Sequence, residues 1–394
     1  MSDEFLPVLQ IIHVTDLHVK VAQANSAHCL SGRLRTLRRV AHRRIRNWNL
    51  FGWDEGTQGY FPRAPNAFAT FLQNWHSQDP EFRDLPVWLV DTGDRTAFGD
   101  YESMDAGERY LSQWVKALGA NCERLSLYGN HDAWPGTLPC LAPLKAISKH
   151  KKVVQARPGW DPSAWISSPL TTRIPGRSES ITLYGIDSVC WSIWRNTRAV
   201  GNIAKQTMHD LIAQLKRGIA NGQKGLRIFA MHHPLTFPWE SQEIGHIPFA
   251  KMRLLNQATR ADRISNNAND PAGIGPWAHM LLGGHTHMRY PAGNLPVDIS
   301  QLQARPLIQP QIQLVGGSLM LNKAPGKSGS RPKTRNVDGF SPATVDPYHC
   351  QAQILRFYAS KTDDSLMLMR IPVYSRDGGQ KYIREDADAI FLRY

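Results

Sequence analysis

Seven short apolar segments recur along the chain, and stretches with helical periodicity fill several of the intervals between them. Each segment is rich in β-branched or aromatic residues and ends in turn-forming residues, a pattern typical of a buried strand. The segments are Val8–Thr15, Pro86–Val90, Arg124–Tyr128, Ile181–Ile186, Leu226–Met231, His279–Leu282 and Gln311–Val315. Because strands that alternate with helices build layered folds, the pattern predicts an α/β protein with largely parallel strand pairing.

The intervals with helical periodicity are Asn66–His76, Asp105–Leu118 and Lys205–Arg217. The first of them gathers its large apolar residues on one face, and Asn66 is its expected N-cap. Near the end of the chain, Gln351–Tyr374 contains two strand-like stretches around a polar turn, which predicts a β-hairpin. We expect a single domain over residues 1–394, with this C-terminal β-hairpin at about residues 351–374.

A basic segment follows the first predicted strand. Ser31–Trp48 carries seven arginines, and its apolar residues fall at helical spacing, which predicts a basic amphipathic helix. With the aromatic loop Asn49–Pro65 it forms an expected insert at about residues 31–65, and Asn322–Pro342 is a second basic loop. A charge run is usually a solvated face, so solvent contact and substrate contact are both open interpretations of these arginines.

The overall charge narrows the expected partners. The chain has a formal net charge of +13 and a pI near 9.6, which favours polyanions such as nucleic acid, nucleotides or acidic membrane surfaces. Its apolar runs are of strand length, so no membrane span is expected. Acidic residues stand at the N-terminus where a signal peptide carries basic ones, and the five cysteines form no C-x-x-C pair. The cytoplasm is therefore the expected location.

Polar fragments follow five of the predicted strands. Their carboxylate, amide and imidazole residues are Asp16, His18, Asp94, Asn130, His131, Asp132, His232, His233, His285 and His287. Because ligands bind beyond the carboxyl ends of strands in open α/β sheets, we expect these fragments to converge on one site. Glycines at 93, 129 and 284 directly precede three of the fragments, and a residue without Cβ lets the backbone turn sharply and approach a ligand closely.

The chemistry of this set indicates metal binding. Carboxylate oxygens and imidazole nitrogens together suit borderline divalent metals such as Mn, Fe and Zn, and no cysteine thiolate lies nearby to build a closed structural zinc site. The candidate ligands fill two coordination spheres if one carboxylate bridges; they are Asp16, His18, Asp94, Asn130, His232, His285 and His287. Paired metal ions about 3.5–4 Å apart are a common device for in-line displacement at phosphorus.

The fragments, in their order along the chain, resemble the motifs of the calcineurin-like metallophosphoesterase superfamily. These motifs are D-x-H, G-D, G-N-H-D, a histidine after a strand, and G-H-x-H, and the resemblance spans roughly Val8 to Arg289. The G-N-H-D and G-H-T-H fragments, each behind a strand, are the most specific. The resemblance implies an αββα sandwich, with two central mixed sheets flanked by helices, and the hydrolysis of a phosphate ester.

The resemblance also implies a role for each ligand. The first metal ion would be held by Asp16, His18 and His287, and the second by Asn130, His232 and His285. Asp94 would bridge the two ions, and a metal-bridging hydroxide would be the nucleophile.

A proton donor for the leaving oxygen is implied as well. His131 would protonate that oxygen, with Asp132 orienting the imidazole, and histidine is the side chain best suited to proton delivery near pH 7. Arg95 departs from the family pattern, because an acidic or amide residue is common shortly after G-D. It is a candidate for contact with the substrate phosphate, and exposure to solvent is the alternative.

Three functions are compatible with these features. The first is a phosphodiesterase or phosphomonoesterase for a small molecule or a nucleotide. The second is a nuclease whose arginine-rich helix follows the backbone of DNA or RNA. The third is a non-catalytic basic nucleic-acid-binding protein, against which the complete ligand set argues. The sequence contains no recognisable nucleic-acid-binding module, so the first function ranks above the second.

Overall fold

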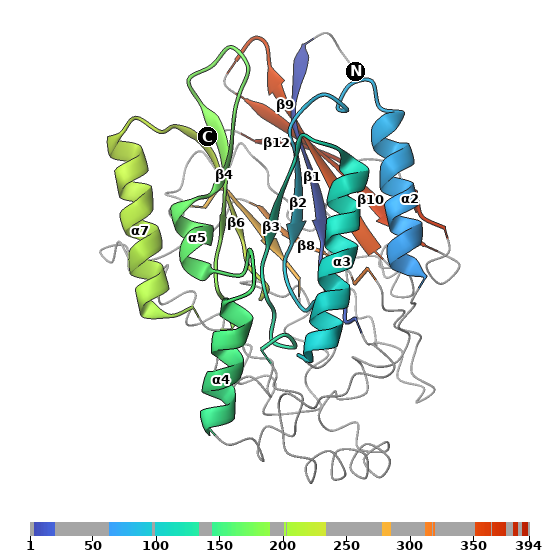
Figure 1. Cartoon of the computed structure of the whole chain (residues 1–394). Coiled ribbons are helices and arrows are strands. Elements are labelled where there is room, and N and C mark those ends of the chain that lie inside the picture. The colour runs from blue at the N-terminus through green and yellow to red at the C-terminus, as the bar shows by residue number, and fades with distance from the viewer. Residues whose placement is uncertain are drawn as a thin grey trace, which may run out of the picture.

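The computed structural model describes residues 4–19, 63–96, 99–133, 144–189, 201, 203–233, 278–284, 312–316, 318–319, 351–363, 365–375, 381–384 and 388–392. Two β-sheets lie at its centre, and helices cover their outer faces. Figure 1 shows α2 and α3 on one side of the strands, with α5 and α7 on the other. The arrangement is an αββα sandwich with two mixed sheets, as the sequence predicts.

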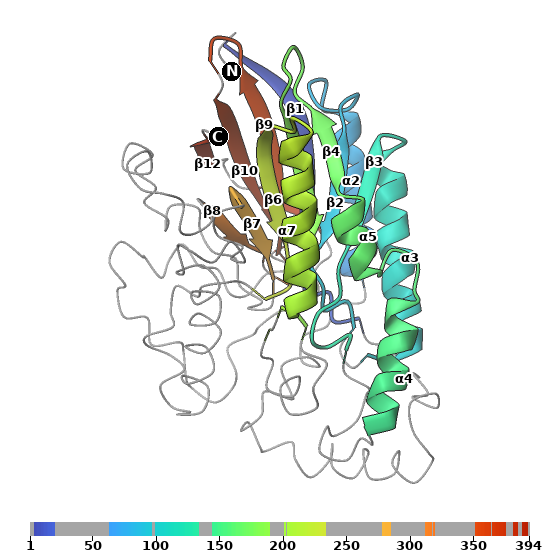
Figure 2. The same ribbon diagram turned by 90° about the vertical axis from the view of Figure 1, so that its left-hand side faces the viewer.

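The first sheet combines a parallel part with an antiparallel part. Its seven described strands are β1 (Phe5–Val14), β2 (Val87–Asp91), β3 (Cys122–Ser126), β9 (Gln351–Ser360), β10 (Leu366–Tyr374), β11 (Ile383–Arg384) and β12 (Asp388–Leu392). The order is β11-β10-β9-β1-β2-β3, and β12 also pairs with β10. The strands β1, β2 and β3 run parallel, whereas β9 and β10 pair antiparallel with each other and β9 pairs antiparallel with β1 (Figure 2).

The second sheet is mostly parallel. Its described strands, in spatial order, are β4 (Leu170–Arg173), β5 (Ser180–Gly185), β6 (Gly225–Ala230), β7 (Met280–Gly283) and β8 (Ile312–Val315). Only the β4–β5 pair among them is antiparallel. Parallel strands end at the same edge of a sheet, so the loops after β5, β6 and β7 leave from one edge.

The described helices are α2 (Ala64–Ser77), α3 (Tyr101–Leu118), α4 (Leu144–Gln155), α5 (Pro162–Ser167) and α7 (Lys205–Ala220). Local sequence sets the ends of α3. Its first turn is capped by Asp100, whose carboxylate accepts the N–H of Ser103 at 2.8 Å, and it stops at Gly119, which has a φ of 87°. No described helix is long and apolar enough to cross a membrane.

Three apolar layers hold the sandwich together, and the period-two alternation of the strands fills them. On β6, Leu226 and Ile228 face the first sheet, whereas Phe229 packs with α7. On β1, Ile11 joins the layer between the sheets, and Ile12 packs under α2 and α3. Both sheets are therefore apolar on both faces, which is the reason that their strands appear in the sequence as nearly continuous apolar runs.

The seven predicted strands are confirmed, with small shifts at their ends, and the three predicted helices are present. The expected N-cap at Asn66 is wrong. Helix α2 begins at Ala64, with Arg63 at the cap position and Pro65 in the first turn, where a residue without a free N–H loses no helical hydrogen bond. The predicted arginine-rich helix Ser31–Trp48 and the basic loop Asn322–Pro342 lie outside the described residues.

Candidate metal centre

Loops from both sheets meet at the carboxyl ends of their strands. Asp16 and His18 follow β1, Asp94 follows β2, and Asn130 follows β3, all in the first sheet, whereas His232 follows β6 of the second sheet. All five are at most 5% exposed. The fold therefore brings together side chains that are more than two hundred residues apart in the sequence.

Asp94 lies at the centre of this cluster. Its Oδ2 atom is 3.2 Å from Nε2 of His232, 3.8 Å from Nε2 of His18 and 4.0 Å from Nε2 of His131. This oxygen is buried. A buried carboxylate oxygen that faces three imidazole nitrogens suits cation binding.

Two groups of potential ligand atoms share Asp94. One comprises Asp16, Asp94 and His232, the other comprises His18, Asp94 and His131, and within each group the ligand atoms lie within 4.8 Å of one another. Asn130 adjoins the first group, because its Oδ1 is 3.0 Å from Nε2 of His232. The donor set and its spacing thus fit two divalent cations joined through Asp94.

Three of the candidate ligands have an unusual backbone. Asp16, His18 and Asp94 have φ angles of 52°, 47° and 54°, and they are the non-glycine residues with positive φ among those that the structure describes. The left-handed region is uncommon for residues with a Cβ, and strained conformations of this kind cluster at functional sites.

Close contact between the loops holds this conformation. The N–H groups of Asp16 and His18 donate to the carbonyl oxygens of Gly93 and Asp94, each at 2.9 Å. Gly129 packs directly on the Asp94 carboxylate, so a Cβ at position 129 would collide with its Oδ1. The same oxygen accepts the backbone N–H of His131 at 2.8 Å, which leaves Oδ2 directed at the imidazoles.

The electrostatics of the cluster keep Asp94 ionised. Burial by itself raises the pKa of Asp94, but the charges of His232, His131 and His18 outweigh it and hold the pKa well below its usual range. Burial lowers the pKa of His232, but Asp94 and then Asp16 outweigh this effect and raise it to about 9. Bound cations would take the place of this positive charge, because a histidine ligand must be neutral.

The orientation of His232 is fixed from behind. Its Nδ1 donates to the carbonyl oxygen of Thr92 at 3.0 Å, which directs Nε2 toward Asp94. Backbone bonds of this type set the tautomer of metal-binding histidines. The neighbouring His233 instead contacts Ser188 through Nδ1 at 3.0 Å. The geometry therefore favours His232 over His233 as the ligand. The hydrogen bond to the Thr92 carbonyl that fixes this orientation cannot be predicted from the sequence.

His131 differs from the other members of the cluster in exposure. Its side chain is 19% exposed, against at most 1% for those of Asp94, His18 and His232. Its ring meets that of His18 edge-on, with centroids 4.6 Å apart. An imidazole at the rim of a buried cluster is accessible to a bound substrate.

Asp132 contacts the loop backbone and not the His131 imidazole. Its carboxylate accepts the N–H groups of Gly129, Arg95 and Thr96 at 3.0, 3.0 and 2.8 Å. Burial, followed by the charge of Asp94, raises the pKa of Asp132 to about 6. These contacts favour a role in joining the loops after β2 and β3, in place of the direct orienting contact expected from the sequence.

The position of the Arg95 side chain contradicts both interpretations of this residue, contact with the substrate phosphate and exposure to solvent. Its side chain is 1% exposed and binds Asp91 and Glu108, and its guanidinium lies 4.3 Å from the centre of the Trp160 ring. It is therefore neither exposed to solvent nor placed to bind a substrate phosphate. The direction of the Arg95 side chain cannot be predicted from the sequence, because contacts with Asp91, Glu108 and Trp160 together define it.

Two further buried histidines, His13 and His279, make hydrogen bonds within the core. Gln353 Nε2 donates to Nδ1 of His13 at 2.6 Å, and Nε2 of His13 contacts the Thr92 hydroxyl at 3.0 Å. Nδ1 of His279 accepts the N–H of Arg227 at 3.0 Å. Burial lowers the pKa of each to about 3, so both are neutral at physiological pH.

The last predicted ligands, His285 and His287, lie outside the described residues. The chain leads toward the cluster up to Gly284. The N–H of Gly284 donates to the carbonyl oxygen of His232 at 2.9 Å, and a Cβ at this position would collide with Thr15 and approach Asp16 to 2.9 Å. The assignment of both histidines as ligands remains a prediction.

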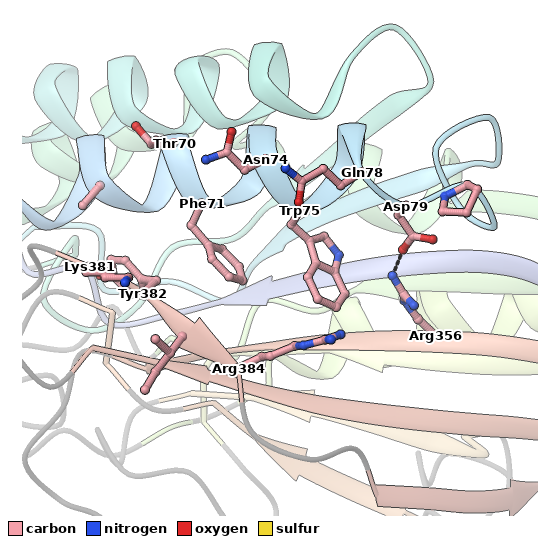
Figure 3. Close-up of a pocket in the computed structure, with 13 residues that line it drawn as sticks. Thr70, Phe71, Asn74, Trp75, Gln78, Asp79, Arg356, Lys381, Tyr382 and Arg384 are labelled. Atoms are coloured by element: carbon pink, nitrogen blue, oxygen red, sulfur yellow. Dashed lines mark ion pairs between the residues drawn. The ribbon is translucent and has the colours of Figure 1, made fainter.

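A separate cavity of about 780 Å³ lies between α2 and strands β9 and β11 (Figure 3). Phe71 and Trp75 project into it from α2, Arg384 lies against Trp75, and Arg356 is paired with Asp79. None of the residues that line it belongs to the Asp94 cluster. The cavity is therefore distinct from the candidate metal centre.

The model of the calcineurin-like phosphoesterase family matches residues 9–289. Among solved structures, the chain is similar to the sulfate thiohydrolase SoxB of Thermus thermophilus in complex with glycerol, with 11% sequence identity and a TM-score of 0.35. The similarity covers 98% of this chain and 56% of the SoxB chain, so this chain spans little more than half of that length. No curated protein matches the sequence.

Proposed function

The chain belongs to the calcineurin-like phosphoesterase family, and we propose that it hydrolyses a phosphate monoester or diester of a small molecule or nucleotide at the Asp94 cluster. Membership gives the general reaction, which is metal-dependent hydrolysis of a phosphate ester. The observation that supports the proposed site is the position of Asp94 in two groups of ligand atoms, each within 4.8 Å. A shared carboxylate can hold two metal ions close together, as a two-metal centre for displacement at phosphorus needs.

The proposed ligands divide around Asp94. By the family resemblance, Asp16 and His18 would hold one ion and Asn130 and His232 the other, with Asp94 between them, and His287 and His285 would complete the respective sets. The two groups of ligand atoms instead pair Asp16 with His232 and His18 with His131, so this division rests on the sequence motifs and not on the spacing. When bound, two divalent ions of the Mn, Fe or Zn type lower the pKa of a shared water and neutralise charge on the phosphate oxygens. The chain contributes a preorganised position for the ligand atoms of the described residues, since the side chains of Asp16, His18, Asp94, Asn130 and His232 are buried.

His131 is the proposed general acid. Its backbone N–H is tied to Asp94 at 2.8 Å, so its position relative to the bridging carboxylate is set by the loop itself. Its side chain is partly exposed at the rim, where it can donate a proton to the departing oxygen. Asp132 supports it indirectly by holding the same loop.

The test is an assay on protein stripped of metal with a chelator and then reloaded with Mn²⁺, Fe²⁺ or Zn²⁺. The substrates are p-nitrophenyl phosphate, bis(p-nitrophenyl) phosphate, cyclic nucleotides and oligonucleotides. We expect hydrolysis of at least one small ester, lost on chelation and restored by metal. Turnover that survives complete metal removal would contradict the proposal.

A nuclease is the second candidate, and the charge of the chain favours it. The net charge is +13, and seven arginines fall within Ser31–Trp48. In the same assay, metal-dependent cleavage of oligonucleotides without turnover of any small ester would identify this function. Binding of nucleic acid without any hydrolysis would indicate the non-catalytic alternative.

A further inference from the structure

We propose that Arg95 is a positioning residue whose buried guanidinium, anchored on Asp91, fixes the loop that presents Asp94 to the metal ions. The inference rests on the proposed function in one respect, which is that Asp94 is a metal ligand. It assigns to this chain an ion-pair network outside the ligand set.

The contact between Arg95 and Asp91 is made by a fork of two N–H groups. Nε and Nη2 of Arg95 both donate to Oδ2 of Asp91, at 3.3 and 3.0 Å. The other oxygen of Asp91 accepts the N–H of Gly93 at 3.1 Å. Asp91 therefore joins the Arg95 side chain to the backbone of the residue that precedes Asp94.

This contact closes a short loop. Asp91 is the last residue of β2, and Arg95 returns over it four residues later, with Asp94 held at a φ of 54° between the two. The main chain of Arg95 is bound as well, because its N–H donates to Asp132 at 3.0 Å and its carbonyl accepts the N–H of Val19 at 2.8 Å. The side chain thus anchors the loop through contacts with residues outside the cluster.

The ion-pair network of Arg95 extends to the protein surface at Glu108 of α3. Nη1 of Arg95 donates to Glu108 at 3.0 Å, and Arg124 of β3 donates to the other oxygen of Glu108 at 2.6 Å. Glu108 is partly exposed, whereas Arg95 and Asp91 are not. The network therefore ties the loop after β2 to a helix and to the neighbouring strand.

Helix α3 is adapted to this side chain. A Cβ at Gly107 would collide with Cγ and approach Cδ of Arg95 to 2.5 Å, so the aliphatic part of Arg95 crosses the helix at its glycine. Glycine inside a helix lowers helix stability relative to alanine. Trp160 covers the guanidinium on another side, 4.3 Å from its ring centre.

Stability alone is a weak explanation for such a pair. Apolar residues of similar volume often replace a buried ion pair without loss of stability, and some buried pairs instead specify one arrangement of the chain. Here the arrangement concerned is the strained loop of Asp94. Residues that orient a metal ligand from behind typically affect metal affinity by about 10–100-fold.

The test compares Arg95→Met, Asp91→Asn and the double variant in the full chain. Asn at position 91 keeps an oxygen for the Gly93 N–H, and the double variant buries no uncompensated charge. Mn²⁺ binding is measured by calorimetry and by metal content, and the melting temperature is measured on metal-free protein. We expect each single variant to melt at a lower temperature and to bind both ions about 10–100-fold more weakly.

The double variant separates positioning from folding. Its melting temperature is expected to recover toward the wild-type value, because no lone charge remains buried, while Mn²⁺ affinity stays low. If a single variant does not fold, the double variant alone decides the question. Arg157→Met is the matched control, because Arg157 also pairs with a carboxylate of α3, Asp105, at 2.7 Å, and its loss should leave Mn²⁺ affinity unchanged.

Wild-type Mn²⁺ affinity in Arg95→Met, or affinity that recovers together with the melting temperature in the double variant, would overturn the inference. Failure of the proposed function gives a different result. Wild-type protein would then bind two Mn²⁺ ions without hydrolysing any ester, and the affinity comparison would still decide the role of Arg95.

Discussion

At the scale of single residues, the two carboxylate oxygens of Asp94 make different contacts. Oδ1 rests against Gly129 and accepts the N–H of His131, which fixes the carboxylate. Oδ2 faces the imidazoles of His18, His131 and His232. The loop motifs therefore contain the candidate ligands together with the glycine and the backbone N–H donors that position them.

Gly129→Ala tests the fixed position of Asp94. The added Cβ collides with the Asp94 carboxylate, so we expect Mn²⁺ affinity to fall by about 10–100-fold, as for other changes behind a ligand. Gly119→Ala is the control, because a Cβ at Gly119 would meet nothing within 4 Å; its φ of 87° is positive, unlike that of Gly129, so any backbone strain falls on the control variant. Titration calorimetry measures both, and equal affinities in the two variants would contradict the tight contact at Gly129.

His131→Ala tests the general acid. The variant should keep its metal ions, because ligands remain on both sides of Asp94. Hydrolysis of an alkyl phosphate ester should slow by roughly 10²–10⁴-fold, the usual contribution of acid catalysis. A nitrophenyl ester should slow far less, because its leaving group departs as a stable anion. Equal losses on the two esters, measured as kcat, would refute the acid role.

At the scale of secondary-structure elements, the side chain of His279 adds a hydrogen bond to the backbone pairing of two strands. The N–H of His279 donates to the carbonyl oxygen of Arg227 at 3.0 Å, and Nδ1 of His279 accepts the Arg227 N–H at 3.0 Å. The imidazole thus adds a hydrogen bond to the start of the β6–β7 pair. It must be neutral to accept that bond, so this junction is sensitive to acid.

The pH dependence of stability follows from His279. Burial and then the charge of Arg227 lower its folded-state pKa from 6.5 to about 3. Below pH 6.5 the unfolded state binds a proton that the folded state does not, so stability falls with falling pH, by about 2 kcal/mol at pH 5. His279→Asn keeps an acceptor for the Arg227 N–H and does not titrate.

We therefore expect His279→Asn to lose less stability than the wild type between pH 7 and pH 5, in denaturant unfolding of the metal-free protein. His209→Asn, at an exposed position of α7, is the control and should follow the wild type. Parallel stability profiles for His279→Asn and wild type would show that the buried imidazole is not responsible.

The elements that the sequence predicts well are those with a strong local signal. Strands buried on both faces, such as β1 and β6, have nearly continuous apolar runs. In contrast, β4 is the short segment LTTR at a sheet edge with exposed positions, and α4 is rich in lysine, so neither has a distinctive pattern. The predicted N-cap at Asn66 is wrong because the helix begins at Ala64, with a proline in its first turn.

The residues of the candidate site also fall into those whose position the sequence predicts and those whose position it does not. Motif order and strand ends predict that Asp16, His18, Asp94, Asn130 and His232 converge. The direction of the Arg95 side chain depends on its contacts with Asp91 of β2, Glu108 of α3 and Trp160, which no local pattern encodes. The one signal for it in the sequence is a glycine inside the predicted helix, at position 107.

At the scale of the whole molecule, the two sheets build the site together. Asp94 comes from the first sheet and His232 from the second, and their ligand atoms are 3.2 Å apart. Ions bound between them would therefore join the sheets, and binding to the folded state alone raises stability by mass action. The packing of the sandwich and the assembly of the centre are expected to be coupled.

The basic character of the chain also acts at this scale. If the arginines of Ser31–Trp48 recruit a polyanionic substrate, reversing the charge of Arg38, Arg39, Arg43 and Arg44 should raise KM with kcat nearly unchanged. The difference should shrink as salt rises, because screening already weakens such contacts. For an oligonucleotide the salt dependence should also flatten. An unchanged KM at low salt for nucleotides and oligonucleotides would identify these arginines as a solvated face.

The central claim is that Asp94 is shared by two metal ions at the junction of the sheets. The most direct measurement is the metal content of wild-type protein and of Asp94→Asn, which keeps the shape of the side chain and removes its charge, after loading with Mn²⁺ and removal of free ions. We expect two ions per wild-type chain and loss of both, together with nearly all turnover, in Asp94→Asn, whereas removal of His18 should be milder. Two tightly held ions in Asp94→Asn would contradict the account.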